Sequence, residues 1–90
     1  MAKQGGPVGP EDAAIGAELQ AQRKYHGLSR ETVVEQAGIG LTHLREVEAG
    51  VTSARLQTLY RLCEVIGISF RELLDGADRR IIRNKAESDD

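Results

Sequence analysis

Several features that would assign this chain to a familiar class are missing from it. The 90 residues include a single cysteine, Cys63, so no disulfide can form within the chain and a disulfide-stapled secreted scaffold is excluded. Cys63 is interpreted as a small buried hydrophobe. Tryptophan is absent and aromatic residues make up 3% of the chain, which disfavours a sheet that stacks nucleic-acid bases.

Long apolar runs are also missing. None approaches the roughly 20 residues that span a bilayer. The N-terminus has no basic region followed by the apolar stretch of a signal peptide. We therefore expect a cytoplasmic protein that makes no membrane contact.

Residues that could support catalysis are sparse. His26 and His43 are the only histidines, and neither stands at a metal-ligand spacing from Cys63 or from an acidic pair. Glu46 and Glu48 are two apart, so on a helix they point to different faces and form no carboxylate dyad. The sequence therefore predicts no catalytic residue, no metal site and no cofactor, and it disfavours an enzyme.

The length and the two ends of the chain indicate one domain. Residues 1–10 are rich in glycine and contain both prolines, which predicts a flexible arm. Residues 77–90 are rich in charge and are interpreted as a tail, in which residues 79–83 extend a helix or form a dimer contact. The folded domain is predicted to comprise residues 11–76.

Helix starts and stops recur at short intervals along residues 11–76, and no segment alternates as a strand would. The stops are His26-Gly27, Gly38, Gly50 and Gly67. The starts are Pro10 with Glu11 and Asp12, the capping residue Ser29, and the capping box of Ser69 and Glu72. The inward-facing residues are predicted to be Ile15, Leu19, Val33, Val34, Ala37, Leu44, Val47, Leu56, Leu59, Leu62, Cys63, Ile66, Phe70, Leu73 and Leu74. The sequence thus predicts an all-α bundle of about five short helices.

A short turn joins the second and third predicted helices. It reads Ala37-Gly38-Ile39-Gly40, and two helices joined by three or four residues including glycine are typical of a helix-turn-helix. Glycines are also common between helices of any kind. The turn alone therefore fits either a helix-turn-helix or an ordinary connection between two helices.

The wider sequence resembles the lambda-repressor-like helix-turn-helix family, also called the Cro or Xre family. The resemblance covers residues 15–74 and rests on IGAELQAQRKYHGLS, RETVVEQAGIGLTHLREVEAG and LQTLYRLCEVIGISFRELL. The Ala-Gly-Ile turn, the Val-Glu-x-Gly ending and the Ile-Gly-Ile-Ser-x-x-Glu-Leu-Leu close are jointly specific. The fold that the resemblance implies agrees with the helix pattern.

The resemblance implies that the third helix, at about residues 41–49, lies in the major groove of DNA. Leu41, Thr42, Arg45 and Glu46 are then left on its outer side as the base-reading residues. Leu41 can meet a thymine methyl, Thr42 a base or phosphate, Arg45 a guanine or phosphate, and Glu46 a cytosine amino group. His43 lies near the edge of this face, either as a further contact or as a solvated surface histidine.

The resemblance also implies contacts with the phosphate backbone of DNA for a second set of residues: Arg30, Thr52, Ser53 and Arg55. Arg30 starts the second helix, where the family usually has a glutamine, and the others lie in the polar loop after Gly50. The alternative for Arg30 and Arg55 is ordinary surface arginine. Arg23 and Glu48 match an internal ion pair of the family, which contributes little net stability but is costly to break.

The sequence departs from the family pattern at several positions. Gly40 replaces the usual serine or threonine cap, Leu41 is apolar where a long polar residue is common, and Ala54 replaces a frequent proline. The chain as a whole has 12 basic and 14 acidic residues, a net charge of −2, whereas many DNA-binding domains are strongly basic. Affinity per subunit is therefore expected to be modest, with a shallow dependence on salt.

Two functions fit these observations. The first is a sequence-specific DNA-binding transcriptional regulator of the Xre or Cro type that binds double-stranded, palindromic operator DNA as a homodimer, through the fifth helix and residues 79–83. It would be cytoplasmic, of prokaryotic or phage type, and associated with the nucleoid when bound. The alternative is a protein-interaction module on the same fold: an antirepressor, an antitoxin or an adaptor of a transcription complex that uses an exposed Leu41.

Overall fold

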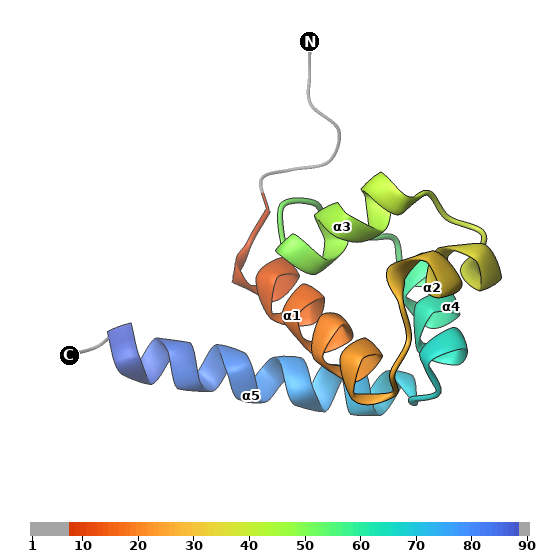
Figure 1. Ribbon diagram of the computed structural model, residues 1–90. Helices are drawn as coiled ribbons and strands as arrows, with labels where there is room; N and C mark the ends of the chain where they lie inside the picture. The colour runs from red at the N-terminus through yellow and green to blue at the C-terminus, as the bar shows by residue number, and fades with distance from the viewer. Residues whose placement is uncertain (1–7, 89–90) are drawn as a thin grey trace, which may run out of the picture.

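A computed structural model describes residues 8–88 (Figure 1). Most of the predicted arm, and Asp89 and Asp90, lie outside the described residues. Five α-helices follow one another: α1 (Pro10–Tyr25), α2 (Arg30–Ala37), α3 (Leu41–Ala49), α4 (Leu56–Ile66) and α5 (Phe70–Ser88). The described part of the chain contains no strand, so the predicted all-α fold is confirmed. None of these helices is long and apolar enough to cross a membrane.

The helices begin and end for local reasons. Gly27, Gly38, Gly50 and Gly67 have positive φ angles between 70° and 97°, a conformation that disfavours residues with a Cβ. The Ser29 hydroxyl accepts a hydrogen bond from the Thr32 N–H at the start of α2. At the start of α5, the Ser69 N–H donates to Glu72 Oε1 at 2.7 Å, and the Glu72 N–H donates to Ser69 Oγ at 3.0 Å. The predicted stops and these two caps are therefore confirmed.

The core forms where all five helices meet. Its buried members are Leu19, Val33, Ala37, Leu44, Val47, Leu59, Leu62, Cys63, Ile66 and Leu73. Ile15, Val34, Ile39 and Phe70 pack against them and are partly buried. Most of the inward-facing residues predicted from helical spacing are thus in or against the core, and Cys63 is a buried free thiol, as expected.

The prediction of an inward-facing side chain is wrong for two residues. Leu56 is 60% exposed and Leu74 is 42% exposed. Leu56 is the first residue of α4, and it lies about 60° around the helix from Leu59. Leu74 borders an open groove between α1 and α5, which leaves much of its side chain exposed.

Helix α5 continues through the segment interpreted as a charged tail to Ser88, because no glycine or proline interrupts it after Gly76. Of the two interpretations of residues 79–83, the extension of a helix is the one that the structure contains. Ala77 is buried, and Arg80 is tied to α1 by an ion pair between its Nε and Glu18 Oε1 at 3.0 Å. As Figure 1 shows, α5 runs along α1 and extends beyond it.

Glycine lets α1 approach α3 closely. A Cβ added at Gly16 would collide with the carbonyl oxygen of Val47 and lie 2.9 Å from that of Glu48. Both obstacles are backbone atoms, which cannot rotate away as a side chain can. The end of α3 therefore rests directly on the backbone of α1.

Candidate nucleic-acid interface

Three helices meet at the buried carboxylate of Glu48, near the end of α3. Arg23 of α1 donates from Nε to Glu48 Oε2 at 2.7 Å and from Nη2 to Oε1 at 3.2 Å. Arg30, the first residue of α2, donates from Nε to Glu48 Oε1 at 2.9 Å. The Nη1 group of Arg23 also donates to the Leu28 carbonyl oxygen at 2.8 Å. The structure thus contains the Arg23–Glu48 pair implied by the resemblance and adds Arg30 to it.

Two guanidinium groups keep Glu48 ionised although it is buried. Burial alone would raise its pKa, because a charged carboxylate is poorly solvated there. The hydrogen bonds and positive charges of Arg23 and Arg30 outweigh this, so the pKa of Glu48 lies below its ordinary value of 4.5. Arg23 and Arg30 therefore hold α3 in place through charged hydrogen bonds to Glu48.

The two faces of α3 differ in burial. Leu44, Val47 and Glu48 are buried on the inner face. Thr42, Arg45 and Glu46 are exposed on the outer face, and among the described residues their side chains make no hydrogen bond or ion pair. Thr42, Arg45 and Glu46, which the sequence predicts to read bases, are thus presented to solvent by a helix whose opposite face is buried.

Three further residues of α3 lie at or near the outer face. Leu41 and His43 are half-buried. Ala49 is exposed, and helical spacing places it beside Thr42 and Arg45, seven and four residues before it. The sequence pattern did not single out Ala49, because a short apolar side chain gives no chemical indication of a contact. Its seven-residue spacing from Thr42 places it on the outer face.

The four residues predicted to contact phosphate have different surroundings. Arg55 is exposed at the N-cap of α4, where no side chain caps the helix, and Thr52 is half-buried nearby. The Ser53 hydroxyl donates to Asp12 of α1, so its hydrogen is already used. The Arg30 side chain is 33% exposed while its Nε holds Glu48, which leaves its two Nη groups for an outside acceptor.

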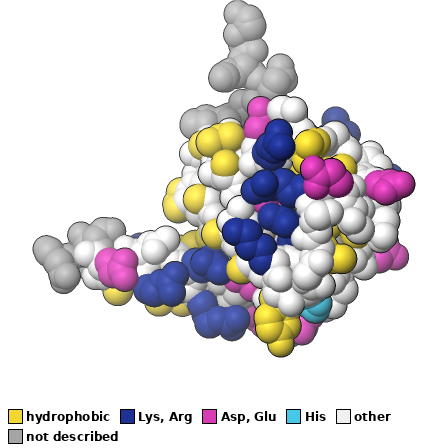
Figure 2. Space-filling view, in the orientation of Figure 1, with side chains coloured by type: hydrophobic (Ala, Val, Ile, Leu, Met, Phe, Trp, Pro, Cys, Tyr) yellow, Lys and Arg dark blue, Asp and Glu magenta, His cyan; other side chains and the backbone are white. Residues whose placement is uncertain are grey.

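Basic side chains form two groups on one face of the molecule. Figure 2 shows Lys and Arg side chains in a column over α3 and α1, and a second group over the far half of α5 on the same face. Acidic side chains border the column in the same view, so the basic side chains form local groups on a chain whose net charge is −2. Such local groups of positive charge attract polyanions even when the whole chain is acidic.

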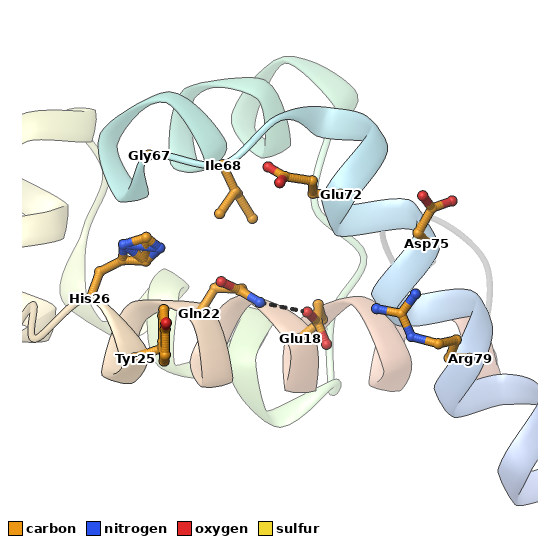
Figure 3. A pocket seen from close by; sticks show the side chains of 9 residues that line it. All are labelled: Glu18, Gln22, Tyr25, His26, Gly67, Ile68, Glu72, Asp75 and Arg79. Carbon is orange, nitrogen blue, oxygen red and sulfur yellow. Dashed lines mark hydrogen bonds between the residues drawn. The ribbon is translucent and has the colours of Figure 1, made fainter.

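A separate pocket of about 410 Å³ lies between α1 and the α4–α5 turn. Figure 3 shows Glu18 and Gln22 of α1 on one side, joined by a hydrogen bond, and Ile68, Glu72 and Asp75 on the other. None of its lining residues comes from α2 or α3. In the described part of the chain, no group of three or more His, Cys, Asp or Glu residues could hold a metal ion.

Comparisons with known proteins agree with this geometry. A helix-turn-helix family model matches residues 19–73. An uncharacterised HTH-type transcriptional regulator of Sinorhizobium fredii, y4dJ, is 30% identical over 64 residues, which is 71% of this chain and 83% of that protein.

Two solved structures share the fold. The clp gene regulator ClgR of Corynebacterium glutamicum superposes with a TM-score of 0.86 at 24% identity, over 92% of this chain and 88% of that one. The restriction-modification controller protein C.Esp1396I, in a tetramer bound to its natural operator of 35 base pairs, superposes with a TM-score of 0.73 at 11% identity. That match covers 80% of this chain and 95% of the other.

The matched region spans α2, the glycine turn and α3, together with the helices that hold them. Members of this family are regulators rather than enzymes. The chain therefore belongs to the Cro/C1-type, lambda-repressor-like helix-turn-helix family of DNA-binding transcriptional regulators.

Proposed function

We propose that this regulator reads a specific operator with α3 in the major groove, through Thr42, Arg45 and Glu46. One observation supports this most: three polar side chains without intramolecular partners lie on the outer face of a helix whose inner face is fixed by Glu48. Base edges in the major groove present a distinct pattern of donors, acceptors and methyl groups. A rigid helix with free polar side chains is suited to discriminate among them.

Each side chain has a chemical counterpart. Arg45 donates to the O6 and N7 acceptors of guanine, Glu46 accepts from the amino group of cytosine, and Thr42 bonds a base or a phosphate. Leu41, half-buried at the start of α3, offers apolar contact to a thymine methyl, and His43 stands at the edge of the same face. We include Ala49 as an additional position that approaches a methyl group.

The backbone contacts are proposed to come from Arg30, Thr52, Ser53 and Arg55. Arg30 combines two roles, since its Nε holds Glu48 while its Nη groups reach a phosphate. Arg55 stands beside the uncapped N-terminus of α4, whose free N–H groups favour an anion. Ser53 must first release Asp12 in order to donate, so its contribution is the smallest of the four.

We further propose a homodimer on a palindromic operator. A groove of about 310 Å³ between α1 and α5 is lined by Ile15, Leu74, Ala77 and Ile81. Glu11 of α1 and Asp75 and Asp78 of α5 also line the groove. The two aspartates lie in the first half of α5, and Lys85 lies near its end. Two copies packed antiparallel would cover the apolar residues and bring these opposite charges together.

The solved structures support DNA, rather than another protein, as the binding partner of this chain. C.Esp1396I, which shares this fold, binds its operator as a tetramer. The protein-interaction alternative rests on Leu41, which is half-buried at the start of α3.

Selection of binding sites from random double-stranded DNA with the purified protein tests the proposal. We expect a palindromic consensus, and we expect Arg45→Ala and Glu46→Ala to relax base preference at single positions while Arg30→Ala weakens all sequences alike. Failure to bind any DNA at low salt would favour a protein partner. An asymmetric consensus would exclude the symmetric dimer.

A further inference from the structure

The loop between α3 and α4 is held against the first turn of α1 at two points. A Cβ added at Gly50 would lie 2.6 Å from the Cα of Ala13, so the two backbones are in close contact there. Three residues later, the Ser53 hydroxyl donates a hydrogen bond to Asp12 Oδ1. In Figure 1 the loop leaves α3 beside the start of α1. The first turn of α1 therefore supports the loop that is proposed to contact the DNA backbone.

The middle of this loop has little other support. The Val51 N–H donates to the Glu46 carbonyl oxygen at 3.1 Å, but among residues 8–88 the backbone of residues 52–54 forms no hydrogen bond. Ala54 packs against the core through apolar contact, which is not directional. The hydrogen bond from Ser53 to Asp12 is thus the directional contact that fixes this stretch.

Asp12 is itself held in place. The Gly9 N–H donates to Asp12 Oδ2 at 3.0 Å, and the Asp12 N–H donates to the Gly9 carbonyl oxygen at 3.0 Å. One carboxylate oxygen therefore caps α1 while the other holds Ser53. Because α1 also rests on the backbone of α3 at Gly16, Asp12 fixes the loop relative to the helix that is proposed to read the bases.

Ser53 stands between Thr52 and Arg55, two residues proposed to contact phosphate. Among the described residues, the side chains of Thr52 and Arg55 form no hydrogen bond or ion pair. Both are therefore available to an outside acceptor, whereas the hydroxyl hydrogen of Ser53 is directed to α1. A loop that is already held in one position loses less conformational freedom when it binds a partner.

We propose that Asp12 is a positioning residue for DNA binding. By holding Ser53, it keeps the loop in the position from which Thr52 and Arg55 meet the phosphate backbone. This inference rests on the proposed DNA-reading function, and it explains why Ser53 itself contributes least to the backbone contacts. Contacts with the backbone carry no direct sequence information, so Asp12 sets the overall affinity and not the base preference.

The experiment measures affinity for a duplex that carries the selected site and for duplexes with single base changes. It compares the original chain with Asp12→Ala, Ser53→Ala and the double variant. Each single variant should bind every duplex about threefold more weakly. The double variant should bind no more weakly than either single variant, because both substitutions remove the same hydrogen bond.

Two further variants separate this role from charge and from helix capping. The amide of Asp12→Asn can accept from the Gly9 N–H and donate to Ser53 Oγ, so it should restore the affinity that Asp12→Ala loses. Ser69→Ala is the matched control, because it removes a cap from the start of α5 and leaves the loop intact. It should bind DNA as the original chain does.

Several outcomes would overturn the inference. Tighter binding by Asp12→Ala would show that Asp12 competes with phosphate for the Ser53 hydroxyl. Additive losses in the double variant would show that Asp12 and Ser53 act separately, and an equal loss in Ser69→Ala would show a general effect of lost capping. Absence of binding by the original chain is a distinct result, because it contradicts the proposed function on which the inference rests.

Discussion

Arg30, the first residue of α2, donates its Nε–H to Glu48 of α3 at 2.9 Å, and through this carboxylate it is linked to Arg23 of α1. The residue expected to contact the DNA backbone is therefore bonded to the helix expected to read the bases. A shift of Arg30 toward a phosphate would move a partner of Glu48, so backbone binding and the orientation of α3 are mechanically connected.

Removal of Arg23 should weaken both folding and DNA binding. Arg23→Ala leaves the buried Glu48 with one arginine and deprives the Leu28 carbonyl of its donor. We expect the free energy of unfolding to fall by about 3 kcal/mol, the lower end of the cost of breaking a buried pair. Urea denaturation measures this. Arg30→Ala, at the more exposed partner, should cost less than about 1 kcal/mol, and equal costs for the two variants would contradict the predicted ranking.

Acid should destabilise the fold through Glu48. Its folded pKa lies below the ordinary value of 4.5, so the unfolded state binds the proton more readily. The stability from this group is complete above the unfolded pKa and is lost as the pH falls through the folded pKa. Denaturation at a series of pH values below about 5 should give a shallower decline for Glu48→Gln than for the original chain. Glu64→Gln, at an exposed position, serves as control, and parallel curves for all three proteins would exclude Glu48 as the cause.

Substitution of Gly16 should separate α1 from α3. The Cβ of Gly16→Ala collides with the backbone of Val47, so the cost should reach about 3 kcal/mol, at the high end for overpacking. Gly27→Ala has nothing within 4 Å of its new Cβ and meets only the strain of a φ of +70°, which costs roughly 1–2 kcal/mol. Thermal unfolding of the two variants tests the difference, and a Gly16→Ala protein as stable as Gly27→Ala would show that the helices can part easily.

The Cys63 thiol should be inert in the folded protein. Burial, and secondarily the negative charge of Glu72, raise its pKa to about 11, so the reactive thiolate is scarce near neutral pH. A thiol reagent at pH 8 should label the folded chain slowly and the urea-unfolded chain rapidly. Rapid labelling of the folded chain would mean that the core around α4 opens readily.

The fold was largely predictable because its helix boundaries are local. A glycine with positive φ or a capping side chain acts within a few residues, and both are visible in the sequence. The errors at Leu56 and Leu74 arose where apolar spacing continues beyond the surface that other helices cover. The end of α5 was left open by the sequence because the contact that anchors it, from Arg80 to Glu18, joins residues 62 apart in sequence.

The candidate site was predictable in part. Helical spacing identified Thr42, Arg45 and Glu46 as outward-facing, and their exposure agrees with it; their contacts with bases remain predictions. The link from Arg30 to Glu48 and the hydrogen bond from Ser53 to Asp12 were missed. Both depend on how two helices lie in space, for which no local pattern gives a signal. Gly16 was also overlooked, although a glycine inside a helix often marks a close approach.

The two faces of α3 have a consequence for how operator preference can change over time. Thr42, Arg45 and Glu46 support nothing else in the described fold, whereas Leu44, Val47 and Glu48 support much of it. Substitutions on the outer face should therefore be almost neutral for stability. A duplicated copy of the gene could acquire a new operator through a few such changes without compensating mutations, and a designer could retarget the protein by the same route.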